Sequence, residues 1–245
     1  MPRVFHRYAA HEMCGTLPAV LYKILPTMYA QRFVNTGEMM WSTLTWFQNE
    51  EDPTRGDTSE GMRRYFPSNG LELTRLSHNG RPDNTRIVSP DEGTVYKAAQ
   101  SDHIFIYSMT LAPTLAIGDP ADRVCVEIFD PDAFKKRLGA AVARHRSARA
   151  ENLIHHEVNY WASERPPEEV WALPDRLTMH KHEEFSGQQE YRLAVGTRAN
   201  VFDFENIEGF IVHKDYRWPR LKLDPQAHRL KLRLGSLADC CRSLP

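Results

Sequence analysis

The sequence predicts an α+β fold, in which a mixed, mainly antiparallel sheet carries packed helices. Two stretches, 103–109 (HIFIYSM) and 124–129 (VCVEIF), are rich in the β-branched and aromatic residues that interior strands favour. The predicted helices lie between strands without a regular strand–helix alternation, which favours α+β over a doubly wound sheet. The 245 residues, 41% apolar and 26% charged, suffice for one sizeable core, so we expect a single domain over residues 1–245.

The N-terminal part of the chain predicts a strand, a helix and a second strand. The apolar run 19–24 predicts the first strand. Residues 27–35 predict a short helix that turns Tyr29 inward and ends near Gly37, a residue suited to a helix C-terminus. Residues 39–44 then predict a strand that leads out of this helix.

The middle of the chain combines polar loops with a well-defined helix. A turn-rich acidic loop covers 48–60, and the sequence NGRPDN at 79–84 predicts the tip of a hairpin. Asp130 and Pro131 are the expected cap and first residue of a helix that continues to about residue 149. The inward stripe of this helix is expected to be Phe134, Leu138, Ala141 and Val142.

The later elements are shorter. Residues 158–161 predict a strand, and residues 166–173 and 175–182 predict two helices. Residues 190–195 (EYRLAV) and 209–213 (GFIVH) predict two further strands.

The C-terminal part predicts a basic hairpin at about 214–235. Apolar and charged residues alternate at 221–223 and 230–234, which indicates two strands with one charged face. Seven lysines and arginines stand against two aspartates there, a net charge of +5, with Tyr216 and Trp218 interleaved. Such a surface suits nucleic-acid phosphates, although a solvated hairpin face is the commoner explanation.

Composition narrows the classes of protein. The net charge of −1 gives no global reason to expect nucleic acid or a membrane as partner. No apolar run approaches the roughly 18 residues of a membrane-spanning helix, and residues 1–10 lack the pattern of a signal peptide. The four cysteines show no disulfide framework, and we expect reduced thiols at Cys240 and Cys241. These observations predict a cytoplasmic protein with no membrane partner.

The histidine clusters do not predict a metal site. The segments 155–157 (HHE) and 180–183 (HKHE) lack the H-E-x-x-H spacing that places two imidazoles on one helical face. The acidic loop lacks the ligand spacing of an EF-hand. We therefore expect no bound metal.

Gln188 and Glu190 form the first candidate site, where a polar turn becomes a strand. A period of two places both side chains on the same side of that strand, so an amide and a carboxylate can converge on one bound molecule. The alternative is a polar strand start with Glu190 paired to Arg192, which lies on the same face.

The segment 41–47 (WSTLTWF) forms the second candidate site. As a strand it would place Thr43 and Thr45 on one face and Ser42 on the other, between large aromatic rings. Hydroxyls can orient a carboxylate, and the rings can stack on a planar heterocycle. The alternative is an amphipathic strand that buries Trp41 in the core.

Taken in order, these pieces resemble a group of poorly characterised bacterial proteins related to the ADP-ribosyltransferase superfamily, including its abortive-infection and toxin members. The resemblance covers roughly residues 20–215. It rests on the segments Leu21-Tyr22-Lys23, Trp41-Ser42-Thr43, Asp52-Pro53, Phe105–Ser108 and Gln188–Arg192.

One common arrangement in that superfamily is a basic residue on the first strand, a serine-threonine-serine element, and a Q/E-x-E element near the end. Lys23 would be the basic residue, and Gln188 and Glu190 match the last element. Ser42 and Thr43 match the middle one, whose third position here is a leucine.

The resemblance implies an NAD-dependent mono-ADP-ribosyltransferase, such as a toxin or phage-defence effector, that transfers ADP-ribose to a protein or nucleic acid. Glu190 would stabilise the positive charge on the ribose, Gln188 would orient the acceptor, and Ser42 would position Glu190. The residues that it assigns to the NAD site are Tyr22, Lys23, Trp41, Thr43, Trp46, Arg63 and Tyr65.

Two alternatives stay open. The lysine at position 23 and the leucine at position 44 motivate a non-catalytic member of the same fold that binds a nucleotide or a partner. The basic C-terminal part motivates a nucleic-acid-binding protein, which is also compatible with an ADP-ribosyltransferase whose acceptor is nucleic acid.

Overall fold

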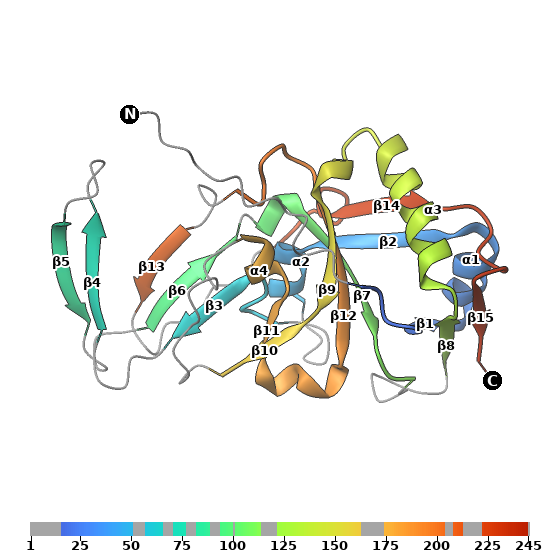
Figure 1. Cartoon of the computed structure of the whole chain (residues 1–245), viewed down its shortest axis with the longest axis horizontal. Helices are drawn as coiled ribbons and strands as arrows, with labels where there is room; N and C mark the ends of the chain where they lie inside the picture. Colours follow the sequence, from blue (N-terminus) through green and yellow to red (C-terminus); the bar gives the residue numbers. More distant parts are fainter. Residues whose placement is uncertain are drawn as a thin grey trace.

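The computed structural model describes residues 16–50, 57–65, 71–76, 82–88, 94–99, 101–113, 122–162, 174–203, 208–212 and 222–244. Its helices and mainly antiparallel strands form an α+β fold, as the sequence predicts (Figure 1). Within the described ranges, none of the helices has the length and apolar character that crossing a membrane requires.

An eight-stranded antiparallel sheet organises the fold. Its main path runs in the order β14-β2-β7-β1-β8-β15, while β12 pairs with β7 and β9. The strands are β1 (Leu21–Pro26), β2 (Glu38–Thr43), β7 (Ile104–Thr110), β8 (Arg123–Ile128), β9 (Leu153–Glu157), β12 (Glu190–Gly196), β14 (Arg229–Arg233) and β15 (Cys241–Ser243).

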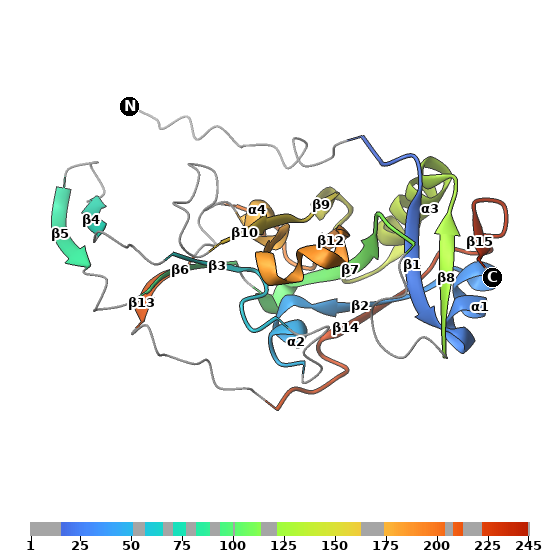
Figure 2. The ribbon, with the colours of Figure 1, turned by 90° about the horizontal axis from the view of Figure 1, so that it is seen from below.

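The sheet forks at β7. All seven residues of β7 pair with β12, but two different strands share the other edge of β7. Strand β2 pairs with the first half, where Ser42 lies opposite Ile106, and β1 pairs only at the far end, where Tyr22 lies opposite Thr110. Figure 2 shows β1 and β8 turning steeply away from β2 and β14. Ser108 therefore lies at the opening between β1 and β2.

Helix α1 (Thr27–Thr36) follows β1 directly. Gly37 ends it in the left-handed conformation (φ 61°) and donates its backbone N–H to Phe33 O at 2.9 Å, as a C-terminal glycine is expected to do. Phe33 is buried as expected, but Tyr29 is not: its side chain is 47% exposed, and Ala30 faces the core instead. Tyr29 is one helical turn before Phe33 on the same side of α1, but its ring stays at the open edge of that side.

Helix α3 (Pro131–Arg144) confirms the predicted capping. The Asp130 carboxylate accepts the Ala133 N–H at 3.0 Å, and Pro131 occupies the first turn. The helix ends at Arg144, earlier than expected. Its buried stripe is the predicted one, with Phe134, Leu138, Ala141 and Val142.

The strand predicted at 39–44 becomes helical at its end. Helix α2 (Leu44–Gln48) begins at Leu44, because the Thr43 hydroxyl accepts the Trp46 N–H at 3.1 Å and caps the helix. The expected alternation of faces across 41–47 is therefore wrong beyond Thr43.

Three smaller sheets complete the strands that the structure describes. Strand β6 (Thr94–Ala98) pairs with β3 (Met62–Tyr65) and β13 (Glu208–Val212). Strands β4 (Leu71–Leu76) and β5 (Pro82–Val88) form the predicted hairpin, but β5 already includes 82–84, and residues 77–81 lie outside the described residues.

The remaining small sheet is the parallel pair β10 (Asn159–Trp161) and β11 (His180–His182). The helix expected over 175–182 is wrong in part, because α4 (Pro174–Thr178) gives way to β11. The helix expected over 166–173 lies outside the described residues. The short 3₁₀ helices are η2 (Ser101–His103), η4 (Ala150–Asn152) and η6 (Glu183–Gln188).

Strand β14 does not form the expected C-terminal hairpin with 221–223. It pairs instead with β2, where Arg229 lies opposite Ser42 and Arg233 opposite Glu38. Among the described residues, 222–224 form no strand, and 213–221 lie outside them. The alternation of β14 is nevertheless as predicted, with leucines buried and cations exposed.

The main core lies between the sheet and helices α1 and α3. Phe33 stacks on Tyr107 with ring centroids 6.4 Å apart, and Trp41 packs against the same tyrosine at 5.6 Å. Cys240 and Cys241 are buried free thiols with their Sγ atoms 3.8 Å apart. This core covers one face of the forked sheet. On the other face of β7, a second apolar cluster buries Ile104 and Ile106, and Ser108 follows them along the strand.

Candidate functional site

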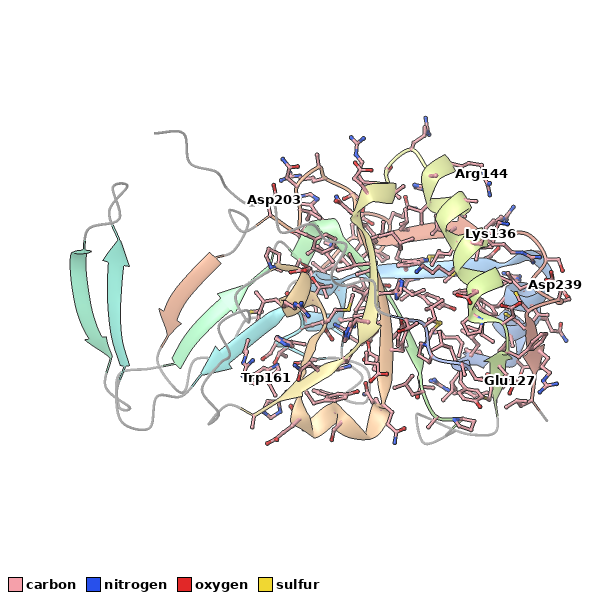
Figure 3. All side chains as sticks on the ribbon, in the orientation of Figure 1. Glu127, Lys136, Arg144, Trp161, Asp203 and Asp239 are labelled. Atoms are coloured by element: carbon pink, nitrogen blue, oxygen red, sulfur yellow. The ribbon has the colours of Figure 1, made fainter. Side chains whose placement is uncertain are left out.

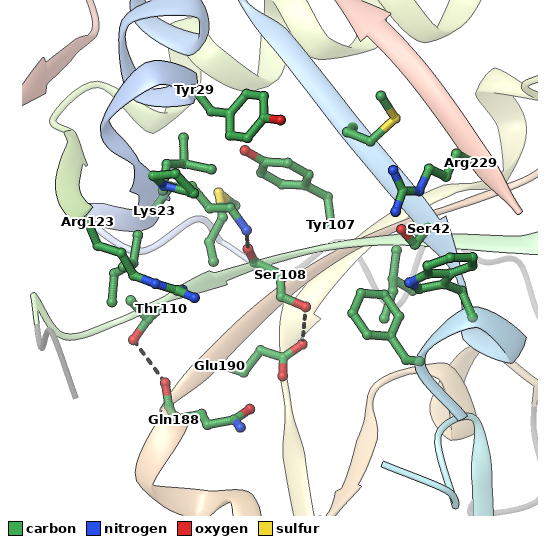
Figure 4. Close-up of a pocket in the computed structure, with 18 of the residues that line it drawn as sticks. Lys23, Tyr29, Ser42, Tyr107, Ser108, Thr110, Arg123, Gln188, Glu190 and Arg229 are labelled. Carbon is green, nitrogen blue, oxygen red and sulfur yellow. Dashed lines mark hydrogen bonds between the residues drawn. The ribbon is translucent and has the colours of Figure 1, made fainter. Parts of the chain in front are cut away.

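A cavity of about 470 Å³ opens at the fork between β1 and β2. Figure 4 shows Lys23 and Arg123 on one side of it, Ser42 and Arg229 on the other, and Glu190 beneath Ser108. Five cationic and three anionic side chains line it: Lys23, Arg32, Arg123, Lys181 and Arg229 against Glu38, Glu60 and Glu190. The cavity is therefore suited to an anionic ligand, with a carboxylate at its inner wall.

Glu190 is the first residue of β12, and its carboxylate is only 4% exposed. Oε1 accepts hydrogen bonds from Ser108 Oγ at 2.5 Å and from Arg192 Nε at 2.8 Å. Oε2 accepts one from Lys181 Nζ at 3.2 Å. The register of β12 against β7 explains this convergence, because it places Arg192 directly opposite Ser108. The ion pair of Glu190 with Arg192, which the sequence offers as the alternative to a binding role, is present.

The environment of Glu190 keeps its carboxylate ionised. Burial by itself would raise the pKa of Glu190, but the charges of Arg192 and Lys181 oppose that effect. Together with the hydrogen bonds from Arg192 and Ser108, they hold the pKa of Glu190 well below its ordinary range. The contacts of Glu190 therefore favour a negative charge at the cavity wall.

Arg192 connects Glu190 to a second buried carboxylate. Its Nη1 donates to Glu60 Oε1 at 2.6 Å and to the Thr178 carbonyl at 2.5 Å, and the guanidinium is fully buried. Lys181 lies 3.9 Å from Glu60 Oε2. Burial raises the pKa of Glu60 despite the nearby charges of Arg192 and Lys181. Two cations and two carboxylates therefore form one buried cluster, of which Glu60, Lys181 and Glu190 reach the cavity lining.

Gln188 and Glu190 converge as predicted, but by a different geometry. Gln188 ends η6, and Gln189 follows in the left-handed conformation (φ 42°), so Gln188 is not part of the strand. Lys181 bridges the two predicted residues, because its Nζ donates to Gln188 Oε1 at 2.9 Å as well as to Glu190. Both side chains therefore meet at Lys181, whereas the expected strand alternation does not apply at Gln188.

Lys23 lines the cavity from β1. Its ammonium lies 4.3 Å from the centroid of the Tyr107 ring and donates to the Ser108 carbonyl. Ser108 lies between the part of β7 that pairs with β2, at Ile106, and the part that pairs with β1, at Thr110, so its carbonyl can accept the ammonium. Lys23 and Glu190 thus bind Ser108 through its backbone and its side chain, respectively.

Ser42 and Trp46 also line the cavity, as the sequence predicts. Ser42 projects from β2, and the Trp46 ring lies 4.7 Å from the Arg229 guanidinium. Ser42 does not contact Glu190, however, and Ser108 takes the role of orienting that carboxylate. The serine that holds the carboxylate therefore comes from β7 and not from the segment 41–47.

The other predicted NAD-site residues do not gather at the cavity. Trp41 is fully buried in the core, and Thr43 is buried as a helix cap whose hydroxyl also lies 2.9 Å from His228 Nδ1. Tyr22 does not line the cavity. Arg63 does not line it either, because its side chain is buried with the guanidinium 6.0 Å from the Trp161 ring. The side chain of Tyr65 lies outside the part of the chain that can be described.

The sequence interpretation missed Ser108, Lys181 and Arg229. Ser108 is a polar residue inside an otherwise apolar strand, and this interruption is the signal that could have identified it. Lys181 stands in the HKHE segment, whose histidines indicate metal binding and whose lysine matches no motif. No local pattern marks Arg229, because its position depends on the pairing of β14 with β2.

One histidine of each segment, His155 or His180, is buried in the protein interior. Burial lowers the pKa of His155 to about 4 and that of His180 to about 3. His155 Nδ1 lies 2.7 Å from the Tyr191 hydroxyl. In the part of the chain that the structure describes, no group of three or more His, Cys, Asp and Glu side chains is placed to hold a metal ion.

Comparisons with protein-family models, curated proteins and solved structures found no match to this chain. The geometry of the cavity is therefore the basis for assigning its chemistry.

Proposed function

We propose that this protein is an NAD-dependent mono-ADP-ribosyltransferase of the cytoplasm. It would cleave the bond between nicotinamide and ribose in NAD and transfer ADP-ribose to a macromolecular acceptor. The observation that carries this proposal is the position of Glu190, a carboxylate at the wall of a cation-lined cavity that Ser108, Lys181 and Arg192 hold by hydrogen bonds.

The cavity lining supports NAD as the substrate. Its volume of about 470 Å³ falls in the range of small-molecule sites. Lys23 and Arg123 lie together on the β1–β8 side, where they can bind the pyrophosphate. The rings of Tyr29 and Trp46, which also line the cavity, offer apolar faces for planar heterocycles.

Charge development explains the role of Glu190. When the glycosidic bond breaks, its electron pair leaves with nicotinamide, and positive charge develops on the ribose. A fixed carboxylate that is already ionised stabilises this charge without reorganising. The acceptor then forms a bond to the same ribose carbon with its own lone pair, and its proton passes to water. Gln188, an uncharged amide beside Glu190, is placed to orient the acceptor.

The test is the release of nicotinamide and the transfer of labelled ADP-ribose by purified protein, with cell lysate as acceptor. Glu190→Gln should slow both by at least about a hundredfold, because it removes about 3 kcal/mol of transition-state stabilisation. The matched control is Glu183→Gln, which makes the same change at an exposed position of η6. Wild-type protein that neither cleaves NAD nor transfers ADP-ribose would exclude this function.

One observation favours a second candidate, nucleotide binding without cleavage. Both oxygens of Glu190 already accept hydrogen bonds from the protein, which is also how a purely structural buried carboxylate is satisfied. Saturable NAD binding with no release of nicotinamide, measured by calorimetry and by product analysis on the same sample, would select this candidate.

A further inference from the structure

The cavity continues along one arm towards β14. Three alternate residues of β2, namely Glu38, Met40 and Ser42, line it. The cross-strand register places Arg233, Lys231 and Arg229 of β14 directly opposite them, in that order. Residues that are directly opposite in a sheet share a face, so the three cations border this arm of the cavity.

The three cations form an evenly spaced row. All three are exposed, while the intervening Leu230 and Leu232 are buried against the core. Alternate residues of a strand are about 7 Å apart, so the row presents a positive charge at regular intervals. β14 ends the main sheet path among the described strands, which leaves the row accessible from the side.

Glu38 offsets only part of this charge. It pairs with Lys231 at 2.9 Å, and Arg233 and Arg32 lie 3.6 and 4.0 Å from its oxygens. With Arg229, the arm carries four cations against one carboxylate, a net charge of +3. This excess is local, because the whole chain has a net charge of −1.

A methionine side chain and two aromatic rings lie among these charges. Met40 is 45% exposed beside Lys231, and Tyr29 is 47% exposed on the facing helix α1. The Trp46 ring lies 4.7 Å from the Arg229 guanidinium at the inner end of the arm. Cations that alternate with aromatic and apolar faces are the elements with which proteins bind single-stranded nucleic acids, because phosphates and bases alternate in the same way.

We propose that the acceptor of this protein is a single-stranded nucleic acid, which binds along β14 and enters the cavity past Met40 and Arg229. An acidic polypeptide would use the same cations, but it would leave Tyr29, Met40 and Trp46 without a planar partner. The transfer step rests on the proposed function, whereas binding of the strand does not.

The experiment measures fluorescence anisotropy of a labelled oligothymidylate of about 12 nucleotides with the full chain, in the absence of NAD. Wild-type protein should bind it with an affinity that falls as salt rises from about 50 to 200 mM. The variant Lys231→Gln/Arg233→Gln should bind on the order of tenfold more weakly, with a salt slope reduced by about 1.4. Its matched control, Lys136→Gln/Arg144→Gln, removes two charges from the exposed face of α3 (Figure 3).

A third variant, Glu38→Gln, tests the same arm by a gain of affinity. It frees Lys231 and Arg233 from their carboxylate, so the oligonucleotide should bind more tightly than to wild type. A damaged fold cannot produce this result.

Three outcomes would overturn the proposal: no salt-dependent binding by wild-type protein, an equal loss in both double variants, or equally effective competition by polyglutamate. Cleavage of NAD is measured separately on wild-type protein without any acceptor. Cleavage of NAD without binding of the oligonucleotide would refute this inference alone. Binding of the oligonucleotide without cleavage of NAD would refute the proposed function.

Discussion

Ser108 donates its hydroxyl to Glu190 Oε1 at 2.5 Å, although 82 positions separate the two residues in the sequence. The register between β7 and β12 brings them together, since it places Arg192 opposite Ser108 and leaves the preceding glutamate on the same face. The carbonyl of Ser108 meanwhile accepts the ammonium of Lys23. One serine thus fixes both a carboxylate and a cation of the cavity.

Removing this hydroxyl should slow catalysis without abolishing it. We expect Ser108→Ala to lower kcat for nicotinamide release by about tenfold, because a hydrogen bond to a charged group contributes about 1.5 kcal/mol. KM for NAD should change little, since the backbone carbonyl of residue 108 that binds Lys23, on the proposed phosphate side, is unchanged by the substitution. Ser108→Thr keeps the hydroxyl and should recover most of the rate. Equal kcat values for Ser108→Ala and wild type would remove Ser108 from the mechanism.

Local patterns predicted much of the framework. The strand rich in β-branched residues at 104–110 and the Asp130 cap are confirmed, because both depend on neighbouring residues. The helical turn after Thr43 was missed. The threonine cap at its start is as local a signal as the Asp130 cap, but the apolar segment around it was interpreted as strand.

The site could be predicted only in part. Glu190 and its pairing with Arg192 follow from residues two apart on one strand. Lys181, Ser108 and Glu60 reach the same cluster from β11, β7 and a turn before β3, and only tertiary pairing determines those positions. The sequence also does not show whether an aromatic residue beside a serine lines a cavity. Trp41, which precedes Ser42, packs in the core.

Arg192 should be important for stability as well as for the charge of Glu190. Arg192→Met would leave Glu60 and Glu190 buried with Lys181 as their remaining cation, so we expect the free energy of unfolding to fall by about 3–5 kcal/mol. Urea denaturation followed by circular dichroism measures this change. Arg146→Met, at an exposed position after α3, should stay within about 0.5 kcal/mol of wild type.

The coupling of Arg192 to Glu60 can be measured directly. Glu60→Gln in the Arg192→Met background removes one of the two buried carboxylate charges that then share Lys181, so the double variant should be more stable than Arg192→Met alone. Strict additivity of the two substitutions would show that the contact at 2.6 Å contributes no interaction energy.

Two glycines should respond to alanine in opposite directions. Gly37 has a φ of 61°, and an added Cβ would lie 2.5 Å from the Gly235 carbonyl oxygen, so Gly37→Ala should destabilise the protein by at least about 1 kcal/mol. Gly139 is inside α3 with open space around it, so Gly139→Ala should stabilise by about 0.5–1 kcal/mol. Thermal unfolding of both variants tests the C-terminal geometry of α1. A neutral Gly37→Ala would contradict the left-handed turn.

Stability should decrease in mild acid because of buried histidines. The His155 side chain is almost fully buried, and this burial lowers its pKa to about 4, whereas an unfolded histidine titrates near 6.5. Between these values the unfolded chain binds a proton that the folded protein does not, so stability falls as pH drops from about 6.5 to 4 and is level above that range. His180, with its pKa of about 3, acts in the same direction.

The His155 contribution can be separated by substitution. His155→Leu loses the hydrogen bond to the Tyr191 hydroxyl at every pH, so it should be less stable than wild type at pH 7.5. Between about pH 6.5 and 5, however, it should lose about 1–2 kcal/mol less than wild type does, because no proton is bound on unfolding at that position. Urea midpoints at both pH values measure the difference. Parallel pH dependences in the two proteins would mean that the pKa of His155 is the same in the folded and unfolded states.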